Sequence, residues 1–255
     1  MASTEPRVGQ LRSKIEMTLH TYPSVLLWHG RGVESGKTQI IGLKQYLLWC
    51  GRIHIAAGKD DPYADDWLLR LEQKLDETKQ ALDQVRQRVD NILEAIPEGL
   101  DVSRNMSQQP YVTPVFTGGQ FGWKAVMLLM DYDGIVRDVL LAHHIGLLGN
   151  NQRQQMIRVQ GGHAMRSLCN FPVKFPGFSG ATRDDFAANN AKARAAREKF
   201  GELPQDILEG TRRSEFAPAI HRDGEQIEPM GLLGDDSDEE AEATPAQPQS
   251  DESSR

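Results

Sequence analysis

Residues 64–96, ADDWLLRLEQKLDETKQALDQVRQRVDNILEAI, decide the fold, because apolar side chains recur in this segment at alternating intervals of three and four residues. Such a heptad pattern predicts one helix of about 33 residues, or about 50 Å at 1.5 Å per residue, which Pro97 and Gly99 end. Its apolar seam must be buried against another helix, either in a partner chain or in a later segment of the same chain. The seam consists of Leu75, Thr78, Leu82, Val85, Val89, Ile92 and Ile96, of which Leu75, Leu82, Val85, Val89 and Ile92 are the candidate dimerisation residues.

Three further segments have helical character, so the predicted fold class is mainly α with a small β component (α+β). Residues 40–57 are apolar and helical in character, and the GKDDP sequence at residues 58–62 ends the expected helix. Residues 124–148 are apolar on nearly all sides and are expected to form the core helix, and residues 152–169 predict another helix. Residues 109–122, QPYVTPVFTGGQFG, predict a loop or a short hairpin.

Residues 11–19 alternate between apolar and polar side chains, which predicts a half-buried strand. Two copies of this strand, paired across a dimer, would form a two-stranded ribbon whose polar face fits the major groove of DNA. The alternative is an edge strand of a small sheet with its polar face in water. One face carries Ser13, Ile15, Met17 and Leu19, and the other carries Arg12, Lys14, Glu16, Thr18 and His20.

A second informative segment, residues 179–220, reads SGATRDDFAANNAKARAAREKFGELPQDILEGTRRSEFAPAI. Thr182 and Asp185 have the spacing of a capping box, which predicts a helix that runs to Phe200 and ends at Gly201. The helix would be cationic with a narrow apolar seam. The seam is formed by Phe186, Ala193 and Phe200, with Arg194 and Arg197 on one flank and Lys192 and Lys199 on the other.

Together with TLHTYPSVLLWHGR at residues 18–31 and KDDPYADDW at residues 59–67, this segment resembles the AcaB-like transcriptional regulators of integrating conjugative elements. The resemblance extends over about residues 11–220. It implies a bacterial, cytoplasmic, DNA-binding protein of mobile genetic elements that reaches DNA with a ribbon-helix-helix-like arrangement.

Charge is distributed unevenly along the chain. The net charge is −7, but residues 221–255 hold 11 acidic side chains against Arg222 and Arg255. Residues 1–59 carry 8 basic and 3 acidic side chains, and residues 151–200 carry 9 and 3. Both of these basic segments are therefore candidates to face phosphates.

Three regions follow from this division: a flexible N-terminus at residues 1–10, a DNA-binding and helical dimerisation core at residues 11–220, and an acidic tail at residues 221–255. The tail is too polar and too poor in aromatic residues to offset its own ordering entropy, so we expect it to be disordered. Its negative charge would compete with DNA for basic surface or bind a protein partner. Cys50 and Cys169 offer neither a disulfide framework nor a zinc site, and no apolar run is long enough for a membrane span.

The candidate DNA contacts come from both basic segments. The residues expected to face the bases are Arg12, Lys14, Thr18 and His20. The expected phosphate contacts are Arg183, Lys192, Arg194, Arg197, Lys199, Arg212 and Arg213. The alternative for the arginines is a solvated helix flank or pairing with the acidic long helix.

An enzymatic function is not predicted. SVLLWHGRGVESGKTQIIGLK at residues 24–44 resembles a phosphate-binding loop, but Arg31 stands where that motif requires glycine. His143 and His144 are adjacent on a predicted helix and point about 100° apart, so they do not suit one metal ion. The sequence therefore predicts no enzyme, no cofactor and no metal.

The function that these observations favour is a homodimeric, sequence-specific DNA-binding regulator of conjugative transfer genes. The alternative is a structural or adaptor protein of the conjugation machinery, in which the long helix and the acidic tail bind proteins and no DNA is read. Salt dependence separates the two, because a protein that neutralises several phosphates loses affinity for DNA steeply as salt rises.

Overall fold

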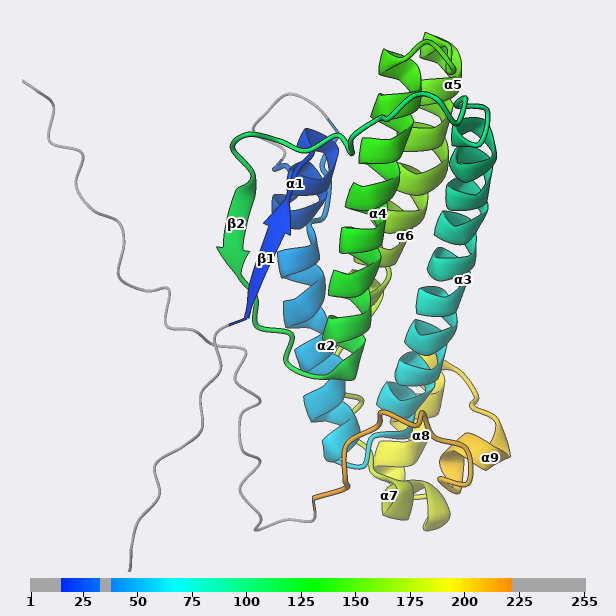
Figure 1. Ribbon diagram of the computed structural model, residues 1–255. Coiled ribbons are helices and arrows are strands. Elements are labelled where there is room, and N and C mark those ends of the chain that lie inside the picture. Colours follow the sequence, from blue (N-terminus) through cyan, green and yellow to red (C-terminus); the bar gives the residue numbers. More distant parts are fainter. Residues whose placement is uncertain (1–14, 33–37, 222–255) are drawn as a thin grey trace, which may run out of the picture.

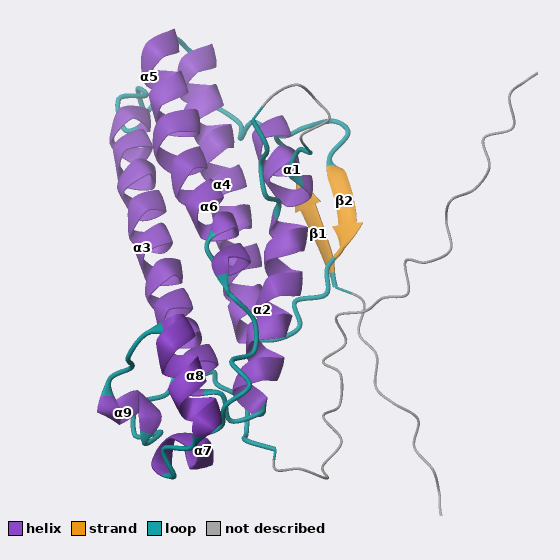
Figure 2. Cartoon of the chain, turned by 180° about the vertical axis from the view of Figure 1, so that it is seen from behind, coloured by secondary structure: helices purple, strands orange, loops and turns teal. Residues whose placement is uncertain are grey.

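A bundle of long helices forms the centre of the molecule in the computed structural model, which describes residues 15–32 and 38–221 (Figures 1 and 2). The predicted flexible N-terminus and all of the predicted tail except His221 lie outside the described residues. The bundle consists of α2 (Leu43–Gly58), α3 (Pro62–Leu93), α4 (Gln120–His144) and a composite fourth helix built from α5 (Asn150–Gln154), η2 (Gln155–Gly161) and α6 (Gly162–Asn170). Among the described residues, no helix combines the length and the apolar character that a membrane span requires.

The long helix is confirmed as α3, Pro62–Leu93. Asp61 caps its N-terminus by accepting a hydrogen bond from the Tyr63 N–H at 3.0 Å, and Pro62 occupies the first turn, where no N–H is needed. The predicted helix extends to Ile96, whereas α3 ends at Leu93 and a turn leads on to Pro97.

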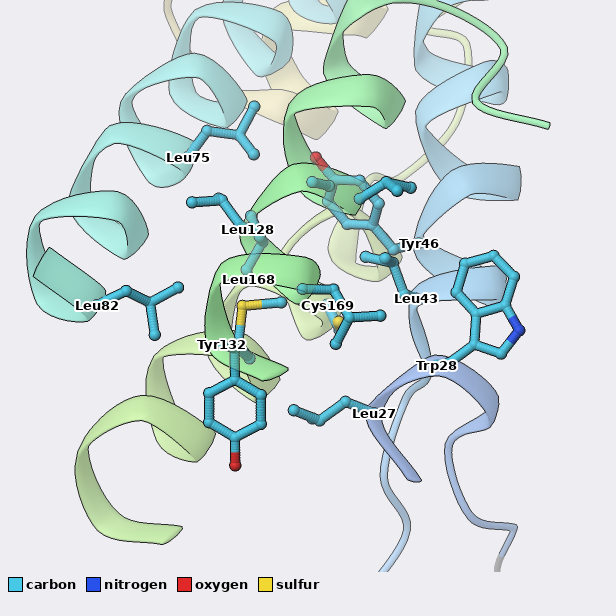
Figure 3. Close-up of a cluster of buried hydrophobic side chains, with 14 of the residues drawn as sticks. Leu27, Trp28, Leu43, Tyr46, Leu75, Leu82, Leu128, Tyr132, Leu168 and Cys169 are labelled. Carbon is cyan, nitrogen blue, oxygen red and sulfur yellow. The ribbon is translucent and has the colours of Figure 1, made fainter. Parts of the chain in front are cut away.

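The apolar seam of α3 packs against α4, η2 and α6 of the same chain. Figure 3 shows Leu75 and Leu82 directed toward Leu128 and Tyr132 of α4. A later segment of the same chain therefore covers the seam, and the assignment of Leu75, Leu82, Val85, Val89 and Ile92 to a dimer interface is corrected. The first four of these side chains are 0–3% exposed within one chain and Ile92 is partly buried against the same core, so they are not available to a second copy.

The predicted N-terminal strand is present as β1 (Glu16–Leu19), and its alternation is confirmed, with Met17 and Leu19 buried. β1 pairs antiparallel with β2 (Tyr111–Pro114) of the same chain, from Glu16 opposite Pro114 to Leu19 opposite Tyr111. The segment expected to be a loop or a short hairpin thus supplies the partner strand. This two-stranded sheet lies beside α1 (Tyr22–His29) and the first half of α2 (Figures 1 and 2).

The composite fourth helix contains one π-helical stretch, η2, where the sequence predicts an uninterrupted α-helix. The wider turns place the Ile157 carbonyl within 2.9 Å of the Tyr132 hydroxyl, which donates a hydrogen bond to it. Glycine is required where this helix approaches Tyr132, because a Cβ on Gly161 would lie 2.9 Å from the tyrosine ring. A side chain on α4 thus satisfies a carbonyl of the widened segment.

At one end of the bundle, the C-terminal segment forms a small layer with its own apolar cluster (Figure 1). The predicted single helix after Thr182 is wrong, because Asn189 adopts a left-handed backbone conformation (φ 47°) and Asn190 caps a new helix. Phe186, Ala193 and Phe200 nevertheless pack in one cluster around Tyr63. The elements of this segment are η3 (Pro172–Lys174), α7 (Arg183–Ala187), α8 (Ala191–Phe200) and α9 (Gln205–Leu208).

Candidate nucleic-acid interface

The outer face of the β1–β2 sheet is the surface that the sequence assigns to DNA. Thr18 and Glu16 are exposed on β1, and their register partners Val112 and Pro114 are exposed on β2. Arg12 and Lys14 lie outside the described residues. Ile15, which the alternation predicts on the inner face, is 43% exposed, although its carbonyl still accepts a hydrogen bond from the Val115 N–H at 2.9 Å.

The end of β1 is fixed to α4 by a buried carboxylate. Asp133 accepts hydrogen bonds from the backbone N–H of His20 at 3.2 Å, from the N–H of Thr21 at 3.0 Å and from the Thr21 hydroxyl at 2.7 Å. The His20 ring nitrogen Nδ1 accepts a bond from the backbone N–H of Ser107 at 3.3 Å. His20 therefore holds two segments of the fold together, and Thr18 is the exposed one of the two described residues that the sequence assigns to the bases.

A second basic surface lies on α8, where Lys192, Arg194 and Lys199 are exposed. Arg194 donates to the Asn189 carbonyl at 2.8 Å, so the same asparagine that breaks the helix also orients an arginine. Arg197 is held more firmly, because it donates to Asn189 Oδ1 at 2.6 Å and lies over the Phe186 ring. The three exposed cations thus stand on a short helix whose position is fixed by the apolar cluster beneath it.

Arg183 and Arg213 both bind Asp65, a residue of α3 with no exposed surface. Arg213 makes a two-pronged contact, with Nε and Nη2 at 2.9 and 3.1 Å from the two carboxylate oxygens, and Arg183 also binds Asp60. Burial alone would lower the pKa of Arg183, but the hydrogen bonds and charges of Asp65 and Asp60 raise it. For these two arginines the structure therefore shows pairing with the acidic long helix. Arg212 is different, since its side chain is 62% exposed and lies 3.6 Å from Asp206.

Asp61 adds a third carboxylate to this joint between α3 and the C-terminal segment. It accepts hydrogen bonds from the backbone N–H of Ser179 at 2.7 Å and from the Ser179 hydroxyl at 2.8 Å. Burial raises the pKa of Asp61, and the hydrogen bonds from Ser179 oppose that rise. The acidic motif at residues 59–67 and the basic segment at residues 179–220 thus meet in space, which gives both motifs a structural role.

A third basic surface lies along α2, in a segment whose apolar composition alone predicts only a core helix. Lys44, Arg52 and Lys59 are exposed along α2, and each lies over an aromatic ring: Trp28 at 5.9 Å, Trp49 at 4.6 Å and Phe178 at 5.6 Å. No acidic residue occurs within α2. We call the exposed stripe formed by Lys44, Leu48, Arg52, Ile55 and Lys59 the α2 cationic face. Its spacing of four, four, three and four residues is the sequence signal that would have revealed it.

The segment that resembles a phosphate-binding loop lacks the strand that such a loop follows, because the apolar run before it forms helix α1. Residues 33–37, which include Gly36 and Lys37, are outside the described part of the chain. The part that is described contains no group of three or more side chains placed to hold a metal ion. Cys50 and Cys169 are buried, and burial raises the pKa of each thiol to about 12.

Comparison with known proteins gives one family and one fold. The family model described as "Transcriptional regulator AcaB" matches residues 7–221. The crystal structure of selenomethionine-containing AcaB from uropathogenic E. coli is similar to the chain with a TM-score of 0.50 and 14% sequence identity, over 78% of this chain and 98% of that one. No curated protein matches the sequence.

Proposed function

The chain belongs to the AcaB family of transcriptional regulators, and on this premise we propose that it is a cytoplasmic homodimer that binds double-stranded DNA sequence-specifically and regulates conjugative transfer genes of a mobile element. The observation that carries the DNA-binding part is the fixed, outward-facing sheet of β1 and β2. A two-stranded ribbon fits the major groove, where each base pair presents a distinct pattern of donors and acceptors.

In this proposal each subunit supplies a complete ribbon, since β2 of the same chain takes the place of a second copy of β1. Thr18 contacts base edges, and Arg12 and Lys14, which lie outside the described residues, are further candidates for base contacts. The Asp133 hydrogen bonds support this role, because a strand whose end is already fixed loses little further conformational freedom on binding.

Phosphate contacts come from the exposed cations of α8. Lys192, Arg194 and Lys199 are the proposed contacts, while Arg197 orients the helix that carries them. Contacts of this kind supply affinity that falls with salt, and they position the protein without reading the sequence.

We expect Thr18→Ala to weaken binding to the specific DNA site by roughly 1–3 kcal/mol and to leave binding to random DNA almost unchanged. Lys192→Ala and Lys199→Ala should weaken binding to both kinds of DNA alike. Each should also lower the slope of log K against log salt by about one. Fluorescence anisotropy with DNA from the element itself and with a scrambled duplex, over a salt series, measures both effects.

Two matched variants control this experiment. Lys79→Ala removes an exposed lysine of α3 that pairs with Asp83, and Thr211→Ala removes an exposed threonine three residues after α9, a helix that lies away from the sheet (Figure 1). Both should bind DNA like the parent. If Thr18→Ala also binds the specific site like the parent, β1 does not contact the bases. A parent protein that binds neither the specific nor the scrambled duplex at low salt would favour the adaptor function.

A homodimer needs a surface other than the seam of α3. α4 leaves Trp123, Met127 and Met130 between 41% and 47% exposed at intervals of four and three residues, which places them on one side of the helix. We propose that a second copy covers this side of α4.

Met127→Glu should therefore raise the dissociation constant of the dimer at least about tenfold, since burying one unpaired carboxylate costs more than 1.4 kcal/mol. Sedimentation velocity over a concentration series measures the change. Met106→Glu, at a methionine that is 60% exposed in the segment before β2, is the control and should leave the constant unchanged. A parent protein that sediments as a monomer at every concentration would refute the homodimer.

A further inference from the structure

The α2 cationic face adjoins a shallow groove between the second half of α2 and residues 175–178. The groove has a volume of about 350 Å³ and combines two apolar side chains with two cations at its rim: Ile55 and Phe178, which are 41% and 46% exposed, and Arg52 and Lys59. A surface of this composition suits a peptide that has an apolar part followed by an acidic part.

The described part of the chain ends at His221, beside the C-terminal end of α2. The backbone N–H of His221 donates a hydrogen bond to the Gly58 carbonyl at 2.9 Å, in the last turn of α2 and next to Lys59. Residues 222–255 therefore follow a residue bound to Gly58, next to the groove residue Lys59, so a high effective concentration favours docking within one chain.

The tail sequence has the two parts in the required order. Residues 227–233, IEPMGLL, are the apolar part, and six of the eight positions in residues 235–242, DDSDEEAE, are acidic. At up to about 3.5 Å per residue, the chain from His221 to Ile227 spans about 20 Å, more than the roughly 10 Å of helix between Arg52 and Lys59. The acidic part then has ample length to follow α2 to Lys44, about 22 Å from Lys59 along the helix.

We propose that residues 227–242 dock on the α2 cationic face, with Met230 and Leu232 in the groove and the acidic run beside Arg52 and Lys44. The occupant is thus a segment of the same chain, selected by charge complementarity and by where it begins. Docking neutralises a helix face that carries cations and no carboxylate, and it keeps nucleic acid from binding there non-specifically. The docking itself does not depend on the function proposed above.

The test uses the full chain without DNA, so its outcome is independent of DNA binding. Leu232→p-benzoylphenylalanine places a photo-crosslinker in the apolar part, and mass spectrometry locates the crosslinked peptide. We expect crosslinks within one molecule to residues 48–59 or 175–178. The same crosslinker at Ser250, outside the docking segment, should give at least fivefold less of this product.

Charge reversal then tests the acidic part. Arg52→Glu combined with Lys59→Glu should lower the crosslink yield at least fivefold, whereas Lys74→Glu combined with Lys79→Glu on α3 should not change it. Arg52 and Lys59 are exposed, so we expect their double variant to melt at the same temperature as the parent. If that variant is unstable, replacing the six acidic residues of 235–242 by their amides should lower the crosslink yield to the same extent. The proposal would be overturned by crosslinks to other parts of the chain or by crosslinks between differently isotope-labelled molecules. It would also be overturned if these charge changes left the crosslink yield unchanged.

Discussion

Leu82→Asp combined with Val89→Asp is expected to lower the free energy of unfolding by more than about 5 kcal/mol, which leaves the chain largely unfolded. Leu82 is 2% exposed and Val89 has no exposed surface, and both belong to the seam that packs against α4 and the fourth helix. A carboxylate at either position would lose its hydration without gaining a partner. Urea denaturation followed by circular dichroism measures the loss.

The matched control places the same two charges on the opposite side of α3. Gln80 and Gln84 are exposed on that helix, and Gln80→Asp with Gln84→Asp should change the unfolding free energy by less than about 1 kcal/mol. If the seam variant unfolded at the same urea concentration as the control, the seam would not lie in the core.

The second large effect is expected from Asp65→Asn, which should destabilise the fold by about 3–5 kcal/mol, because it leaves two largely buried guanidinium groups, 12% and 22% exposed, without their shared carboxylate. Asp65 has no exposed surface and binds both Arg183 and Arg213. Asparagine keeps the volume of the side chain, so the loss reports the charge. Thermal and chemical denaturation should agree on its size.

Asp83→Asn is the corresponding control for Asp65→Asn. Asp83 also pairs with a cation on α3, but the two side chains of that pair are 55% and 60% exposed. Water and salt screen such a pair, so its loss should cost at most about 1 kcal/mol. Equal effects at the two positions would mean that the joint around Asp65 is solvated.

Local patterns sufficed to predict α3, the alternation of β1 and the helical class, because each depends on spacing within one segment. The same heptad spacing fits a partner chain or the chain itself, so the position of the covering helix could not be derived from it. The pairing of β1 with residues 111–114 is a long-range choice that no local pattern encodes. The break at Asn189 and Asn190 did have a signal, since asparagine tolerates the left-handed conformation and caps helices well.

The candidate site was less predictable than the fold. A run of arginines indicates positive charge but does not say which arginine a distant carboxylate will bind, and the fold brings Arg183 to Asp60 and Asp65. The spacing of Lys44, Arg52 and Lys59 predicts the α2 cationic face, but the overall apolar composition of residues 40–57 does not reveal it. Sequence reasoning identifies charged segments, and the tertiary structure decides which charges remain available.

The distance along the chain between β1 and β2 has a consequence for folding kinetics. Because Leu19 pairs with Tyr111, the sheet closes a loop of about 90 residues that contains α1, α2 and α3. Closing so long a loop costs entropy that only later contacts offset, so the sheet should form late in folding. During synthesis, a nascent chain that has not yet reached residue 111 carries β1 without its partner strand. The strand that we propose reads the bases therefore gains its partner strand only after α1, α2 and α3 have been synthesised, so that shorter nascent chains lack a complete ribbon.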